Sequence, residues 1–234
     1  MKRIGVFIGG SPLPEVGNTV TVELETPWGL ASDCPSEIQL GNNHYVFMRR
    51  HGADRALSPH QVNYRANVWL MNELGVDALL GTHTVGSIDT ELEVGELVLP
   101  DQLIDYTWGR VQTFEDERRH IEFSQPFDVA LRSKLAASIP QLHVGGVYGC
   151  TQGPRLETAA EIRRLANDGC TIVGMTAMPE ASLARELGLA FASLCVVVNP
   201  AAGIGAEVID LEDLQRASQQ GAEQIMTLLQ NLAL

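Results

Sequence analysis

Short apolar runs that alternate with amphipathic segments constrain the fold of this chain more than any other feature. The runs have strand length and stop at Gly, Asn or Pro: Ile4–Ile8, Tyr45–Met48, Ala78–Leu80, Leu97–Leu99, Val144–Tyr148, Thr171–Val173 and Leu194–Val198. Helical periodicity is found in His60–Leu74, Asp128–Ala137, Thr158–Ala166, Pro179–Leu187 and Leu211–Leu232, the last with Asp210 as its expected N-cap. This alternation predicts an α/β fold, a three-layer sandwich in which helices flank a mixed, at least partly parallel, central β-sheet.

Length and composition predict a single domain over residues 1–234. The net charge of −13 argues against nucleic acid and anionic membranes as partners. No run approaches the ~20 apolar residues that span a bilayer, and Gly9-Gly10 interrupts the only stretch that resembles a signal peptide, so we expect a cytoplasmic protein. The four cysteines lack metal-binding spacing, and we expect reduced thiols and no metal.

Polar residues follow several of the predicted strands. Gly9-Gly10-Ser11 comes after the first strand, Arg50-His51-Gly52 after the second, Thr84 to Ser87 after the third, and Asn199 after the last. Sites in α/β folds form outside the carboxyl ends of strands, so we expect these groups to share one pocket. Thr176, after the strand predicted at Thr171–Val173, offers a further hydroxyl. Each group also has a plainer interpretation: the glycines could form a tight turn, the arginine could lie on the surface, and the Thr176 hydroxyl could only stabilise a turn.

The glycine pair is not a dinucleotide-binding motif. Gly9-Gly10-Ser11 lacks the G-x-G-x-x-G spacing, and Pro12 and Pro14 remove two backbone N–H donors, so no nicotinamide cofactor is expected. Further along, the polar stretch Thr107–Arg119 lacks periodicity and predicts a long surface loop. Long loops inside compact domains are often functional.

Five segments together resemble a known family. They occur in order and at suitable spacing: Arg50-His51-Gly52, Gln61 to Asn67, Gln102 to Asp105, Gly153 to Thr158, and Gly174-Met175-Thr176 with Pro179-Glu180. They are similar to the trimeric purine nucleoside phosphorylases, in the branch of methylthioadenosine and methylthioinosine phosphorylases, and the likeness extends from Ile4 to the C-terminal helix. The resemblance implies cleavage of a purine nucleoside, with inorganic phosphate as co-substrate, no other cofactor, and a homotrimer.

The resemblance also implies roles for individual residues. Phosphate binding falls on Ser11, Arg50, His51, Thr176 and the backbone amide of Thr84. The backbone of Met175 would hydrogen-bond the ribose 2'-hydroxyl, and Leu156 would line the base pocket. His120, ahead of Pro126-Phe127, matches a histidine that reaches the site of a neighbouring subunit.

The chemistry of cleavage gives these roles a physical reason. Positive charge builds on the ribose and negative charge on the departing purine, so an anion below C1' and a hydrogen-bonding group at N7 both stabilise the transition state. We therefore expect Arg50 and His51 to act through phosphate and Asn199 through the base, as the catalytic residues.

Two positions predict a 6-oxopurine. Asn199 stands where adenine-specific relatives carry Asp, and an amide can donate to O6 while it accepts from a protonated N7. Glu157 matches the carboxylate that accepts from N1–H in 6-oxopurine enzymes. The alternatives are that Asn199 is an ordinary loop residue before Pro200 and that Glu157 caps the helix that begins near Thr158.

The substituent at the 5' end of the nucleoside is predicted from a missing histidine and from a stretch of aliphatic residues. The chain has no histidine after His143, whereas family members that bind a 5'-hydroxyl use one there, and the corresponding stretch holds Val208, Ile209 and Leu211. An apolar pocket accepts a methylthio group and leaves a hydroxyl unsatisfied. With His120, these residues predict methylthioinosine as the substrate, although the aliphatic side chains could equally be core.

Several departures from the family pattern leave other functions open. Pro12 replaces a glycine beside the phosphate turn, Arg55 a histidine, His83 an asparagine or threonine, and Gln152 an acidic residue. They put the geometry of the phosphate site in question. The alternatives are a phosphorylase of inosine and guanosine or of methylthioadenosine, a nucleoside hydrolase, and a non-catalytic nucleoside-binding trimer.

Overall fold

The computed structural model describes residues 2–9, 17–115, 120–138, 141–205 and 211–233, without the side chain of Leu211. A large sheet contains β1 (Arg3–Ile8), β2 (Asn18–Thr19), β5 (Ser36–Leu40), β6 (Asn43–Arg49), β7 (Ala78–Ser87), β8 (Leu97–Leu99), β9 (Gln102–Asp105), β10 (His143–Val144), β11 (Val147–Cys150), β12 (Ile172–Gly174) and β13 (Ala190–Pro200). β3 (Glu25–Thr26) and β4 (Gly29–Leu30) form a separate ribbon. The helices are α1 (Tyr64–Glu73), α2 (Val129–Ser138), α3 (Ala159–Asn167), α4 (Ala177–Glu186) and α5 (Leu211–Asn231).

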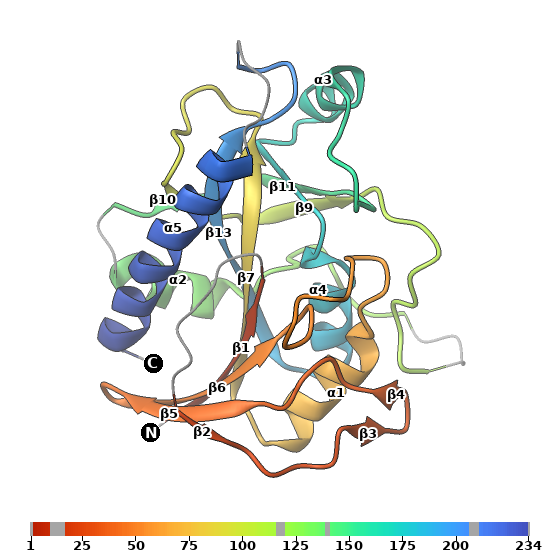
Figure 1. Cartoon of the computed structure of the whole chain (residues 1–234), viewed down its shortest axis with the longest axis vertical. Helices are drawn as coiled ribbons and strands as arrows, with labels where there is room; N and C mark the ends of the chain where they lie inside the picture. Colours follow the sequence, from red (N-terminus) through yellow and green to blue (C-terminus); the bar gives the residue numbers. More distant parts are fainter. Residues whose placement is uncertain (1, 10–16, 116–119, 139–140, 206–210, 234) are drawn as a thin grey trace.

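The sheet is mixed, as the sequence predicts. Four neighbouring strands, β6, β1, β7 and β13, are parallel, and β8, β12 and β5 add to them in antiparallel pairings. The two long strands β7 and β13 run side by side through the middle of the molecule (Figure 1).

Helices cover both faces of this sheet. Figure 1 shows α2 and α5 on one side of β7 and β13, and α1 and α4 on the other. Successive side chains along β1 point to opposite faces of the sheet and so contribute to the core on both sides. Val6 packs into the hydrophobic cluster that contains residues of α2 and α5, whereas Phe7 packs into the cluster that contains residues of α1 and α4. The smaller α3 packs on a third cluster with Ile162 and Leu165.

Three predicted strands differ from the structure in length or continuity. The run predicted as Ala78–Leu80 continues to Ser87, so Thr84 to Ser87 lie within β7 rather than after it. The run Val144–Tyr148 is not one strand, since Gly145 and Gly146 take φ values of 113° and 107° and separate β10 from β11. Asn199 likewise lies inside β13, beside an irregularity in the register at Val197.

The five predicted helices all form, with shifted ends. Asn63 accepts from the amide of Ala66 and so starts α1 inside the range His60–Leu74. Asp210, the expected cap of α5, lies outside the described residues. Among the residues that are described, no helix has the length and apolarity needed to cross a membrane.

Candidate active site

A cavity of about 220 Å³ lies at the carboxyl ends of β7 and β13. Gly86 of β7 pairs with Asn199 of β13, and both line it. The lining residues come from six separate segments: His51 and Pro59; Thr84, Val85 and Gly86; Pro154, Leu156 and Glu157; Val173, Gly174, Met175 and Thr176; Val198, Asn199, Ala201 and Ala202; and Leu214. The prediction that distant polar groups share one pocket is thus met for His51, Thr84 and Asn199.

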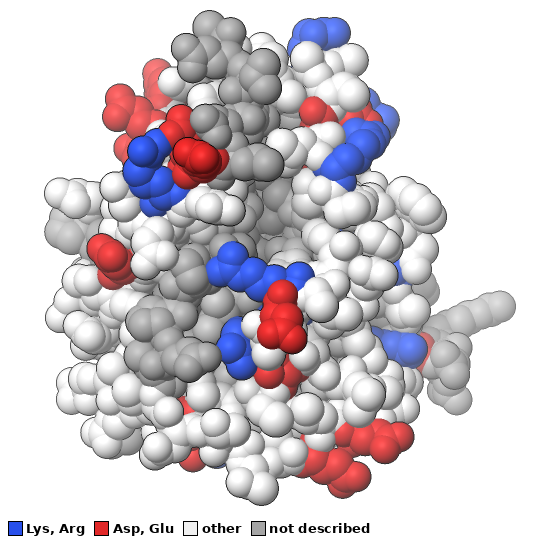
Figure 2. Space-filling view, in the orientation of Figure 1, with Lys and Arg blue, Asp and Glu red and all other residues white. Residues whose placement is uncertain are grey.

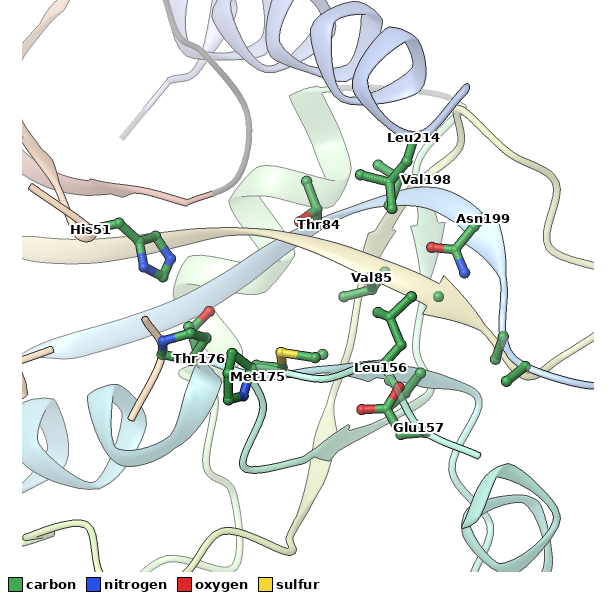
Figure 3. A pocket seen from close by; sticks show the side chains of 17 residues that line it. His51, Thr84, Val85, Leu156, Glu157, Met175, Thr176, Val198, Asn199 and Leu214 are labelled. Carbon is green, nitrogen blue, oxygen red and sulfur yellow. The ribbon is translucent and has the colours of Figure 1, made fainter. Parts of the chain in front are cut away.

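The cavity is elongated, with different chemistry at its two ends. In Figure 3, His51 and Thr176 lie toward one end, and Leu156, Glu157 and Asn199 toward the other. We call these the His51 end and the Asn199 end. The space-filling view shows a hollow in the middle of one face, with Lys or Arg side chains along its lower edge and Asp or Glu side chains directly below them (Figure 2).

His51 is held as a neutral ring. Its Nδ1 lies 2.7 Å from the carbonyl oxygen of Leu57, and because a carbonyl only accepts, Nδ1 carries the proton. Burial, together with the charge of Arg50, lowers the pKa of His51 to about 4. At neutral pH its Nε2 is therefore a hydrogen-bond acceptor.

Arg50 lies behind the wall of the cavity rather than in its lining. The side chain is 0% exposed and forms a two-point ion pair with Glu180 of α4, with Nη2 at 2.9 Å from Oε2 and Nε bonded to Oε1. Its Nη1 donates to the carbonyl of Thr82 at 3.0 Å. Burial opposes its charged form, but the carboxylate of Glu180 outweighs this and raises the pKa of Arg50.

The position of Arg50 still agrees with an anion site beside it. Nη1 and Nη2 each keep one N–H for which the described part of the chain offers no acceptor. A Cβ on Gly9 would lie 2.4 Å from the carbonyl oxygen of Thr82 and 2.6 Å from Nη1, so glycine allows the backbone after the first strand to pass against this guanidinium. The turn that follows, with Gly10, Ser11 and Pro12, lies outside the described residues, and the predicted role of Ser11 stays a prediction.

Thr176 supplies a hydroxyl at the His51 end. It stands at the N-cap of α4, but its side chain makes no capping hydrogen bond, which removes the interpretation that it only stabilises the turn. Its Oγ1 instead lies 2.8 Å from Nδ1 of His83, a fully buried neighbour on β7. Thr84 follows His83 and lines the cavity.

The Asn199 end is open and carries amide and carboxylate groups. The Nδ2 of Asn199 donates to the carbonyl of Pro200 at 2.7 Å, which leaves Oδ1 and one N–H for another partner. Glu157 does not cap α3, because Thr158 does so in a capping box with Glu161. Figure 3 shows Leu156 and Glu157 below Asn199, on the opposite wall.

Thr151 fixes the carboxylate of Glu157. Its hydroxyl donates to Oε1 of Glu157 at 2.5 Å, and the side chain of Glu157 lines the cavity. Thr151 itself lies outside this cavity, in an adjoining one that shares Glu157. Sequence reasoning identified Glu157 and missed its partner, six positions earlier in the chain.

Arg110 is a second residue that sequence reasoning missed. Its Nη1 donates to the carbonyls of Met175 at 2.8 Å and Met178 at 2.7 Å, and its Nη2 to that of Gln152 at 2.8 Å. One guanidinium thus joins the predicted ribose-binding segment to the loop that carries the base-side residues. The loop Thr107–Arg119, predicted as a surface loop, lies partly inside the protein, since Phe114 is also buried.

The remaining predicted residues lie elsewhere. Val208 and Ile209 are outside the described residues, and Val85, Val198 and Leu214 are among the apolar residues that line the cavity. His120 is exposed and does not line the cavity of its own chain. No cluster of three or more His, Cys, Asp or Glu that could hold a metal occurs in the described part of the chain.

Comparison with protein families identifies the relationship. The model of the phosphorylase superfamily matches residues 4–233. The chain belongs to this superfamily. The chain is 44% identical over 237 residues to a probable S-methyl-5'-thioinosine phosphorylase from Pseudomonas syringae pv. tomato, with 95% of each chain covered.

Other relatives share the fold with different named substrates. A 6-oxopurine nucleoside phosphorylase from Pyrococcus furiosus is 36% identical over 244 residues, which cover 98% of this chain and 91% of the relative. The methylthioadenosine phosphorylase from Schistosoma mansoni, solved in complex with adenine, is 28% identical, with a TM-score of 0.89 over 99% of this chain and 90% of that one. These neighbours confirm the nucleoside phosphorylase fold predicted from the sequence.

Proposed function

We propose that the chain cleaves S-methyl-5'-thioinosine with inorganic phosphate, giving hypoxanthine and 5-methylthioribose 1-phosphate for purine salvage. The observation that carries the proposal is the division of one cavity between a His51 end and an Asn199 end. Phosphate would occupy the first and the purine the second, with the ribose against Met175 between them.

The His51 end suits the monohydrogen phosphate dianion. Arg50 can donate from its two spare N–H groups, and the Thr84 amide and the Thr176 hydroxyl add neutral donors. Since Nε2 of neutral His51 accepts, it can take the hydrogen bond of the phosphate P–OH. An anion held there stabilises the positive charge that develops at C1' as the glycosidic bond breaks.

The Asn199 end suits a 6-oxopurine. The spare N–H of Asn199 can donate to O6 while Oδ1 accepts from N7–H, which forms as negative charge develops on the base. Oε2 of Glu157 can accept from N1–H of hypoxanthine, whereas N1 of adenine is itself an acceptor. Leu156 would pack against the base.

The two leading candidate substrates, methylthioinosine and inosine, differ in the substituent at the 5' position of the ribose. The apolar side chains of Val85, Val198 and Leu214 favour a methylthio group, and so do relatives named for methylthioinosine at 44% to 46% identity. A purine nucleoside phosphorylase acting on inosine or guanosine is the second candidate, because the Pyrococcus relative is named for 6-oxopurine nucleosides.

We propose further that the enzyme acts in the cytoplasm as a single-domain homotrimer without a metal cofactor. His120 would complete the 5' pocket of a neighbouring subunit, which agrees with its exposure and its absence from the cavity of its own chain. Sedimentation would test the trimer, and a monomer that is fully active would contradict this role of His120.

The direct test of function is a purine-release assay. We expect the highest kcat/KM for methylthioinosine, a lower value for inosine, and the lowest for methylthioadenosine, with no release when phosphate is omitted. Release without phosphate would indicate a hydrolase. A preference for methylthioadenosine would contradict the role proposed for Asn199, and nucleoside binding without turnover would indicate a non-catalytic protein.

A further inference from the structure

His83 is a buried histidine that the proposed reaction does not use directly. It lies in the middle of β7, one residue before Thr84, and is 2% exposed. The ring fills a space between β7, α4 and Tyr148, whose ring centroid lies 5.6 Å away in an edge-on arrangement. Gly81 makes room for it, because a Cβ there would lie 2.5 Å from Nε2 of His83.

The ring has one hydrogen bond at one nitrogen only. Nδ1 lies 2.8 Å from Oγ1 of Thr176, whereas Nε2 has no hydrogen-bond partner within the described part of the chain. The nearest carboxylate oxygen, Oε2 of Glu180, is 4.0 Å from Nε2, beyond hydrogen-bonding distance, and already accepts from Arg50. Burial and the charge of Arg50 lower the pKa of His83, so the ring is neutral and carries a single proton.

The location of that proton decides what Thr176 can do. If Nδ1 accepts from Thr176, the hydroxyl proton is used up, and only oxygen lone pairs face the cavity. If Nδ1–H donates, the hydroxyl proton is free to point toward the His51 end. The second arrangement leaves an unpaired acceptor at Nε2, whereas the first leaves a buried N–H whose nearest carboxylate, Oε2 of Glu180, is beyond hydrogen-bonding distance.

We infer that His83 is a positioning residue of the anion subsite: its Nδ1–H donates to Oγ1 of Thr176 and directs the Thr176 hydroxyl proton at the bound phosphate. The inference rests on the proposed function, since it takes phosphate as the ligand at the His51 end. Thr176 is suited to this role because its hydroxyl makes no capping bond at the start of α4.

Three variants and a double variant test the inference. His83→Leu removes the donor without adding length, His83→Asn keeps a side-chain donor close to the backbone, and Thr176→Val removes the hydroxyl. We expect His83→Leu to raise KM for phosphate about tenfold, as loss of one hydrogen bond to a charged group does, while KM for the nucleoside changes less than about twofold. His83→Asn should restore KM for phosphate to within about threefold of the original chain.

The double variant separates positioning from packing. If His83 acts through Thr176, adding His83→Leu to Thr176→Val should raise KM for phosphate no further than Thr176→Val does alone. Additive effects, or equal rises in both KM values, would overturn the inference. The rise in Tm on adding phosphate gives the same comparison without turnover, and should be smaller for His83→Leu than for His83→Asn.

Nitrogen-15 NMR of the histidine rings tests the tautomer itself. The His83 signals are those missing from His83→Asn, and the inference requires the proton on Nδ1 when phosphate is bound. A proton on Nε2 would overturn it. Purine release by the original chain without phosphate would instead remove the proposed function, so the two failures are distinguishable.

Discussion

The two ends of the cavity are built on opposite principles. At the His51 end the ionisable groups are buried behind the wall, with Arg50 0%, Glu180 1% and His83 2% exposed, and each is bonded to another part of the chain. At the Asn199 end the side chains face the opening, Leu156 is 42% exposed, and Asn199 makes one bond to a neighbouring carbonyl.

Because of this difference, we expect substitutions at the His51 end to affect the stability of the fold, and substitutions at the Asn199 end to affect which purine is bound. A buried ion pair is costly to break because removal of one partner leaves the other charged and without solvent, so the His51 end tolerates little change. The half-exposed amide of Asn199 can be replaced by another side chain at small cost to the stability of the fold. Such a replacement can exchange a hydrogen-bond donor for an acceptor at the base. We therefore expect the choice of purine to be easy to alter and the use of phosphate to be hard to alter.

The largest expected effect comes from breaking the buried pair. Arg50→Met should lower the free energy of unfolding by about 3–5 kcal/mol, because Glu180 is left buried without its partner, and should abolish phosphate-dependent purine release. Chemical denaturation and the release assay measure the two effects. The double variant Arg50→Met with Glu180→Leu should recover most of the stability but none of the activity. A single variant as stable as the original would contradict the contrast between the two ends.

The second effect is on purine selectivity. Asn199→Asp should shift the ratio of kcat/KM for methylthioadenosine to that for methylthioinosine by about 100-fold toward the adenine nucleoside, because a carboxylate accepts from the 6-amino group and repels O6. Its Tm should stay close to that of the original chain, since the side chain is half-buried. Asn199→Ala is the matched control, and should lower both values without inverting their order. An unchanged ratio would show that the base is recognised elsewhere.

A smaller effect is expected from Arg110, which joins the two ends. Arg110→Met removes the donors that hold the carbonyls of Met175 and Gln152, and should raise KM for the nucleoside about tenfold with a smaller change in KM for phosphate. Arg164→Met, at an exposed arginine of α3, is the control and should change neither value. Equal effects on both KM values would show that Arg110 supports the whole fold instead.

The smallest effect concerns pH. Burial holds His51 and His83 neutral in the folded state, with the pKa of His51 at about 4 against an ordinary 6.5. Unfolding lets both rings take up protons, so their contribution to stability is complete above pH 6.5 and is lost as the pH falls toward 4. The fall in Tm over this range should be shallower in His51→Asn. An unchanged slope in His51→Asn would contradict the buried neutral ring.

Periodicity predicted the layers of the fold because burial on both faces leaves a clear signature in β1 and in the helices. It failed in β7, where the run Gly81-Thr82-His83 looks polar although the side chains of Thr82 and His83 each find a buried partner in another element. It also failed at Gly145, since a short apolar run does not reveal that its glycines break the strand.

Residues that line the cavity were predictable where the family pattern or the ends of strands pointed to them, as for His51, Glu157 and Asn199, while their roles stay predictions. The partners of those residues were not. Glu180 lies 130 positions from Arg50, and no local pattern shows that the two form a pair. Arg110 likewise acts through backbone carbonyls, which any sequence supplies.

The pairing of β7 with β13 sets the length of substrate that the cavity can take. Thr84 pairs with Val196 and Gly86 with Asn199, so the two ends are carried on adjacent strands about two residues, or ~7 Å, apart along the sheet. The register is irregular between Val197 and Asn199, and the ladder on either side of this irregularity holds both positions on the sheet rather than on loops. Nucleoside analogues with an extra atom between sugar and base should therefore be excluded by the backbone itself, however well each half matches its own end.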